Sequence, residues 1–223
     1  EPWGFFNRAL PLMNLGLFEE AIATLERCRR FPERRRSVSI QLCQAHTAKQ
    51  SYQAALAETG WLRSNGFAAW ASRCEAGVHY SQGNSARALE ALRKAKEEQP
   101  GDAEWRSEIE QYELVALADT SPAADCLKLA RQYAAADEAG GFRMSAAMKL
   151  VVAATMAAAS GGPSRDLALR ACAVDNSLTV VVRAAAVLAR RGFPRDAREV
   201  SRRLDLSLDV PRVRAARLRI EGE

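Results

Sequence analysis

The sequence predicts an all-α fold made of antiparallel helix pairs, and three observations lead to this prediction. Alanine, the residue with the highest helix propensity, supplies much of the 48% of the chain that is hydrophobic. Strand-like segments are nearly absent, because the single candidate, Leu178 to Arg183, runs directly into an alanine-rich helical segment. A unit of two helical runs around one glycine also recurs along the 223 residues, a length sufficient for one large domain or two small ones.

The recurring unit is clearest in the N-terminal half. Residues 10–32 and 75–100 both contain a helical run, a glycine, a second run of AxxxL type and a terminal proline. Their glycines, Gly16 and Gly83, are separated by nearly two periods of about 34 residues, which predicts a copy between them. Residues 40–62 supply that copy.

Two further positions extend the pattern. In the copy at residues 40–62, Gln50 stands at the turn where the other copies have glycine. About three periods beyond Gly83, residues 181–204 repeat the arrangement around Gly192. We therefore expect copies of one unit both early and late in the chain.

This pattern resembles the tetratricopeptide repeat, a helix–turn–helix unit of about 34 residues. That family packs a small residue of the first helix against a small residue of the second. Four pairs match this feature: Ala9 with Ala21, Cys43 with Ala55, Ala76 with Ala88, and Ala185 with Ala197. The later hydrophobic and terminal positions of the family are matched by Leu25, Leu92, Pro32 and Pro100. The resemblance implies repeats over residues 5–37, 38–70, 71–104 and 178–211.

The middle of the chain, residues 105–177, is expected to form two more helix pairs that agree less well with the motif. Pro122 favours a helix start, and the glycines at 140–141 and 161–162 break the chain. A closing helix is expected over residues 211–223. The prediction as a whole is one domain over residues 1–223, a right-handed α-solenoid of about six hairpins and the closing helix.

The resemblance also implies a concave groove lined by the first helices, where a partner peptide or helix binds. The residues expected to face this groove are Phe6, Leu10, Met13, Gln41, Gln44, Thr47, Trp70, Arg73 and Tyr80. Relatives that bind the acidic tails of heat-shock chaperones use lysine, asparagine and arginine in such positions, and here only Arg73 fits. The apolar entrance favours a hydrophobic peptide or an amphipathic helix. The alternative is that Phe6, Leu10 and Met13 pack beneath an upstream segment.

Arginines crowd residues 27–36 (RCRRFPERRR), in a chain of net charge +5. The plain interpretation is a solvated helix face, and the functional one is a basic patch for acidic partners or phosphates. The arginines of this patch are Arg29, Arg30, Arg34, Arg35 and Arg36. Nucleic acid is a rival partner, but aromatic residues do not alternate with these arginines in the sequence as base stacking would require.

Catalytic, metal and cofactor sites are not expected. The only histidines, His46 and His79, occupy the same repeat position, which favours structural roles, and no nucleophile motif, phosphate-binding glycine loop or HExxH motif occurs. Five widely spaced cysteines without a CxxC motif predict buried free thiols in a reducing compartment such as the cytoplasm. The most apolar run, Leu150 to Ala159, is too short to span a membrane. The chain starts at Glu1 without a methionine, so a missing signal peptide says little about its compartment.

The sequence therefore predicts a non-enzymatic scaffold or adaptor that binds a protein partner in a preformed groove. Two alternatives remain open. The first is a helical-repeat protein that binds nucleic acid through its arginine-rich edges. The second is an architectural subunit of a larger assembly, held through its repeat faces.

Overall fold

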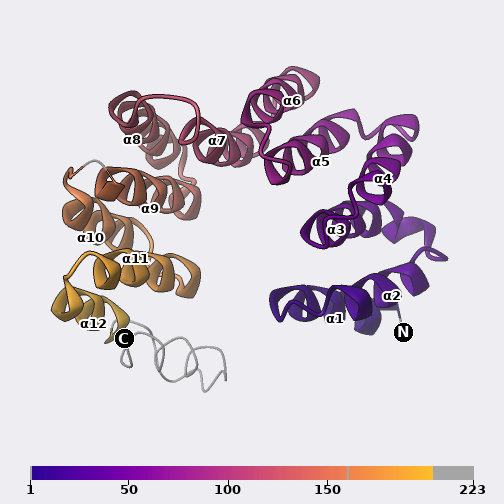
Figure 1. Ribbon diagram of the computed structural model, residues 1–223, viewed down its shortest axis with the longest axis horizontal. Helices are drawn as coiled ribbons and strands as arrows, with labels where there is room; N and C mark the ends of the chain where they lie inside the picture. The colour runs from indigo at the N-terminus through magenta and orange to yellow at the C-terminus, as the bar shows by residue number, and fades with distance from the viewer. Residues whose placement is uncertain (1, 160, 203–223) are drawn as a thin grey trace. The chain divides into compact units, whose positions relative to one another are not determined.

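The computed structural model describes residues 2–159 and 161–202, and within these ranges it is all-α, as predicted (Figure 1). The segment from Leu178 to Arg183, the one strand candidate, lies in a helix. The predicted closing helix at 211–223 and the end of the repeat predicted at 178–211 lie outside the described residues.

The described helices follow one another in six consecutive pairs, the number of hairpins expected from the sequence. These are α1 (Pro2–Asn14) and α2 (Phe18–Cys28), α3 (Arg35–Ala48) and α4 (Tyr52–Ser64), α5 (Ala68–Ser81) and α6 (Ser85–Glu98), α7 (Ala103–Leu117) and α8 (Ala123–Gly140), α9 (Arg143–Ala159) and α10 (Ser164–Val174), and α11 (Leu178–Arg190) and α12 (Pro194–Arg202). A short 3₁₀ helix, Pro32–Arg34, precedes α3.

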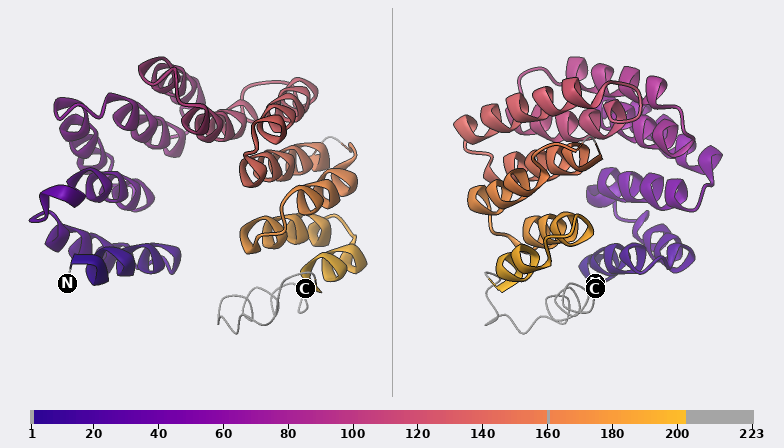
Figure 2. Two further views of the ribbon diagram at one scale, coloured as in Figure 1. Left: turned by 180° about the vertical axis from the view of Figure 1, so that it is seen from behind. Right: turned by 60° about the vertical axis from the view of Figure 1, so that its left-hand side comes forward.

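The chain divides into two compact units, unit 1 (Glu1–Ile109) and unit 2 (Glu110–Glu223), with the boundary inside α7. In unit 1, α1 packs on α2, α3 on α4 and α5 on α6, and each second helix contacts the first helix of the next pair (Figure 2). The first helices also touch one another, α1 with α3 and α3 with α5. In unit 2, consecutive helices from α8 to α12 are in contact, and α9 also contacts α11. The single domain predicted over residues 1–223 stays a prediction.

The turns inside the pairs share one backbone conformation. The residue that follows the first helix has a positive φ in four pairs: Gly16 (76°), Gln50 (63°), Gly83 (75°) and Gly192 (80°). The next backbone N–H then donates to a carbonyl five residues earlier, as in Asn84 to His79 (2.9 Å) and Ser51 to His46 (2.8 Å). This is the Schellman arrangement, which satisfies carbonyls that the helix end leaves open. The prediction that Gln50 replaces a turn glycine is confirmed.

The small residues predicted at the helix contacts are all buried. None of them exposes more than 3% of its surface: Ala9, Ala21, Cys43, Ala55, Ala76, Ala88, Ala185 and Ala197. Cys43 and Ala55 share one apolar cluster with Leu62, while Ala185 and Ala197 share another in unit 2. A larger side chain at these positions would separate the two helices, which explains why the chain uses alanine or cysteine there.

The alanine-rich helix α9 lies in the interior of unit 2. Its alanines at 146, 147, 153, 154 and 157 are fully buried, and Leu150 and Met148 fill the space between neighbouring helices. Alanine allows the flanking helices α8, α10 and α11 to approach α9 closely. This confirms tight interior packing, one of the two roles considered for this segment.

Ion pairs join successive second helices within each unit. In unit 1, Arg29, directly after α2, pairs with Glu58 of α4, and Arg63 of α4 pairs with Glu98 of α6 at 3.1 Å. In unit 2 the corresponding pairs are Glu138 with Arg170 (3.1 Å) and Arg165 with Asp196 (2.6 Å). Each pair therefore connects one hairpin to the next.

Candidate functional site

The predicted groove residues differ in how much surface they offer. Leu10 and Tyr80 are 49% and 39% exposed, and Gln44 is also exposed. Phe6 and Met13 are half-buried, and Phe6 packs against the apolar cluster that joins α1, α2 and α3. Leu10, Gln44 and Tyr80 are therefore the members of the set on the open surface of their helices.

Two polar groove residues make contacts within their own helix or its neighbours. The hydroxyl of Thr47 donates to the backbone carbonyl of Cys43 at 2.7 Å, one helical turn earlier. Gln41 is half-buried, and its side-chain oxygen has no hydrogen-bond partner among the described residues. These two residues are thus partly withdrawn from a ligand, unlike Gln44 on the same helix.

Trp70 and Arg73 are held by the first residues of α7. The rings of Trp70 and Trp105 lie with centroids 4.6 Å apart and are tilted by 57°. Arg73 pairs with Glu108 at 2.7 Å, and its guanidinium carbon lies 5.6 Å from the Trp70 ring centroid. Trp105 is anchored because its indole N–H donates to the carbonyl of Ala95 at 3.0 Å. The Trp70 ring is therefore fixed in place.

A pocket of about 410 Å³ opens beside this ring, and we call it the Trp70 pocket. Its lining includes Arg36, Phe67, Ala68, Trp70, Glu98 and Asp102. The guanidinium carbon of Arg36 lies 5.5 Å from the Phe67 ring centroid and 5.8 Å from that of Trp70. The structure thus brings together Arg36 of the predicted basic patch and Trp70 of the predicted groove, which the sequence presented as separate candidates.

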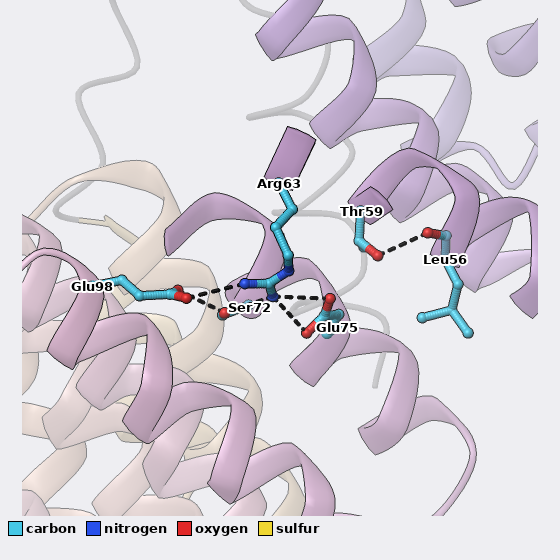
Figure 3. A network of polar contacts seen from close by, with 6 residues as sticks. All are labelled: Leu56, Thr59, Arg63, Ser72, Glu75 and Glu98. Atoms are coloured by element: carbon cyan, nitrogen blue, oxygen red, sulfur yellow. Dashed lines mark hydrogen bonds and ion pairs between the residues drawn. The ribbon is translucent and has the colours of Figure 1, made fainter. Parts of the chain in front are cut away.

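One wall of the Trp70 pocket belongs to a polar network that links α4, α5 and α6 (Figure 3). Arg63 donates to Glu98 at 3.1 Å, to both carboxylate oxygens of Glu75 at 3.0 Å and to Ser72 at 3.1 Å. Ser72 in turn donates to Glu98 at 2.7 Å. Because Glu98 accepts from two groups, its negative charge is already compensated within the protein.

The predicted basic patch separates into residues with different roles. Arg29 and Arg35 both approach Glu58, which is 5% exposed, and the Arg35–Glu58 distance is 3.8 Å. Arg35 also stacks on Trp61 at 4.4 Å, and Arg30 stacks on Phe31 at 4.9 Å. The plain interpretation of a uniformly solvated face was therefore wrong for Arg29 and Arg35.

Unit 2 contains a buried charge cluster that sequence reasoning missed. The Lys149 side chain is fully buried on α9, and its ammonium group lies 2.7 Å from Asp137 and 2.8 Å from Glu110. The same nitrogen lies 5.4 Å from the centroid of the Tyr133 ring. Burial, together with the neighbouring Glu113, raises the pKa of the Tyr133 hydroxyl. A single lysine within an otherwise apolar run was the available signal for this cluster.

The histidines and cysteines are placed as structural residues. Burial lowers the pKa of His46, whose Nδ1 has no hydrogen-bond partner in the described part of the chain. All five cysteines are free and buried: Cys28, Cys43, Cys74, Cys126 and Cys172. Cys43 and Cys74 hydrogen-bond to each other, and this contact and burial raise the pKa of Cys43.

Within residues 2–159 and 161–202, no three histidine, cysteine or acidic side chains are grouped in a way that could hold a metal ion. No helix in the same ranges is long and apolar enough to cross a membrane.

The chain was compared with protein-family models and with curated proteins. No family model matches it. No curated protein matches it either.

Proposed function

We propose that this protein is a non-enzymatic scaffold or adaptor that binds a partner peptide or helix on the surface of its first helices. In this proposal the helix pairs are tetratricopeptide-like repeats that stack into a right-handed superhelix. The observation that carries the proposal is the direct contact between first helices, α1 with α3 and α3 with α5. Contacts of this kind place the residues of alternate helices on one continuous surface.

The residues on that surface support peptide binding. Leu10 and Tyr80 present apolar area, Gln44 is exposed, and the Trp70 pocket lies on α5. Aromatic and apolar side chains held in a fixed conformation are typical anchors for a partner, because little entropy is lost when they are covered. A preformed surface of this type favours an amphipathic helix or an extended peptide with apolar side chains.

The nucleic-acid alternative is less well supported than peptide binding. Arg29 and Arg35 are engaged by Glu58, so two of the five arginines in the patch are partly neutralised. The architectural alternative remains, because exposed residues of the first helices would equally suit a permanent subunit contact.

The proposal is tested by capturing partners from nuclease-treated extract of the native source with the purified chain. Three variants are compared with the parent: Leu10→Asp with Tyr80→Ala on the first helices, Arg30→Glu with Arg36→Glu in the basic patch, and Leu56→Asp as a control. Leu56 is a suitable control because it is 38% exposed but lies on a second helix, α4. Each variant is first shown to melt like the parent.

The three variants distinguish the three functions. Loss of the same partners with the first-helix variant, and their retention with Leu56→Asp, supports the proposed surface. Loss only with the arginine variant supports a basic contact edge. Partners that survive all three changes argue for an assembly held through other repeat faces and against the proposal.

A further inference from the structure

We propose that the Trp70 pocket recognises a carboxylate of an acidic partner peptide, with Arg36 as the residue that binds it. The inference rests on the proposed peptide-binding function and adds the chemical class of one recognised group. It follows from the state of each charged group that lines the pocket.

Arg36 is the charged group of the pocket whose hydrogen-bonding capacity is not used. It stacks between Phe67 and Trp70, and it makes no ion pair with any carboxylate in the described part of the chain. Its neighbour Arg35 differs, because Arg35 approaches Glu58. A stacked guanidinium keeps its N–H groups at the edge of its plane, where they can donate two parallel hydrogen bonds to one carboxylate.

The two acidic residues of the pocket are already engaged. Glu98 accepts from Arg63 and Ser72. Asp102 accepts from the side chain of Gln99 at 2.7 Å and from the backbone N–H of Trp105 at 2.8 Å. A cationic ligand would therefore compete with internal partners for both carboxylates, whereas an anionic group would find Arg36 available.

The aromatic surroundings favour a carboxylate over a nucleotide. Trp70 already contacts Trp105, Arg36 and Arg73, and Phe67 lies against Trp61 with ring centroids 6.3 Å apart and against Arg36. Rings with this many contacts offer little open face for base stacking. Glu98 and Asp102 would also repel the successive phosphates of a nucleic acid more strongly than they repel one carboxylate. The small residue Ala68 leaves room for an apolar side chain next to that carboxylate.

The position of Arg36 is consistent with a role other than helix stability. Arg36 lies in the first turn of α3, which contains no acidic residue. The dipole of a helix favours anions at this end and disfavours cations. The stacking on Phe67 and Trp70 offsets this cost and fixes the guanidinium at the pocket.

The experiment selects ligands from a phage-displayed library of random dodecapeptides, using the purified full chain. The Arg36→Gln variant and the control Arg30→Gln are panned in parallel. Arg30 is a matched control because it is also exposed and stacked on a ring, Phe31, but does not line the pocket. Enriched peptides are synthesised with amidated C-termini, and each acidic residue is replaced by its amide. Dissociation constants are measured by fluorescence polarisation.

We expect the parent and Arg30→Gln to enrich peptides with an acidic residue beside an apolar one. Replacing that acidic residue by its amide should weaken binding to both chains by about tenfold or more. The same replacement should have little effect on Arg36→Gln, because the group that reads the carboxylate is already missing. This comparison uses the peptide as the second variable, so it holds even if Arg36→Gln changes overall affinity.

Three results would overturn the inference. Peptides enriched without an acidic preference would remove it and leave the proposed function intact, as would an amide effect of equal size in the parent and in Arg36→Gln. Displacement of peptide by a single-stranded oligouridylate, dependent on Arg36, would assign the pocket to nucleic acid. Failure of every chain to enrich any peptide would reject the proposed function together with the inference.

Discussion

Gln50 adopts the left-handed backbone conformation that Gly83 adopts one repeat later, with φ values of +63° and +75°. Both residues follow a first helix, and both precede the N–H that closes the same helix-end hydrogen bond. The turn therefore requires a positive φ whichever residue the sequence supplies. A glutamine meets this requirement at a conformational cost that glycine does not have.

Gln50→Gly is expected to stabilise the protein by about 0.5–1 kcal/mol, because the strained conformation is relieved while the turn is kept. Thermal melting with denaturant titration measures this gain. The reverse change, Gly83→Gln, serves as the matched control and should cost a similar amount. No atom lies within 4 Å of a Cβ built at Gly83, so its cost is conformational rather than steric. A Gln50→Gly variant less stable than the parent would contradict the shared turn.

Ala88→Leu is expected to destabilise the protein by roughly 1–3 kcal/mol, because Ala88 is 1% exposed at the contact between α5 and α6. The added atoms must separate the two helices or force an unfavourable rotamer. Ala86→Leu provides the control, since Ala86 is exposed on the same helix and the helix propensities of alanine and leucine are similar. Equal melting temperatures for the two variants would argue against close packing at this position.

Lys149→Met should destabilise the protein by about 3–5 kcal/mol at neutral pH, because it leaves Asp137 and Glu110 without their buried cation. Urea denaturation measures this loss, and Lys128→Met, an exposed change on α8, is the control. The loss should shrink in acid as the two carboxylates take up protons. A loss below about 1 kcal/mol at neutral pH would show that the cluster contributes little to unit 2.

The stability of the parent should fall as the pH decreases below about 6.5, in part because of His46. Burial lowers the folded-state pKa of His46 below its ordinary value of 6.5, so the unfolded chain binds a proton first. The charged groups that act on this ring are Glu58, Glu26, Arg29 and Lys49, from α4, α2 and the ends of α2 and α3.

His46→Gln should flatten this part of the pH profile while leaving stability above pH 7 similarly dependent on pH. Denaturant unfolding at a series of pH values from about 5 to 8 measures the difference between variant and parent. If both proteins lose stability in parallel below pH 6.5, the residue responsible is not His46.

The sequence was sufficient to predict the helix pairs and their turns, because both depend on short-range patterns. The spacing of Gly16, Gln50 and Gly83 carries the turn, and the small residues carry the helix contact within one repeat. Each of these features can be recognised within a window of about 34 residues.

The polar contacts between repeats could not be predicted in the same way. Glu58 and Arg29 are 29 residues apart, and their contact depends on how two hairpins pack rather than on a local pattern. Arg36 looked like one of five similar arginines because Phe67 and Trp70 reach it only through the fold. The sequence located the functional candidates, and the contacts decided which arginine remains available.

The ion pairs between successive second helices restrict how this chain could be rebuilt from its own parts. Ala88 of α6 corresponds to Ala55 of α4, so the position equivalent to Glu58 is occupied by Ala91. If the second hairpin were excised and the first joined directly to the third, Arg29 would meet an alanine in place of its carboxylate. The hairpins are therefore not interchangeable modules. Lengthening or shortening the array by duplication would require matched changes on both sides of each new junction.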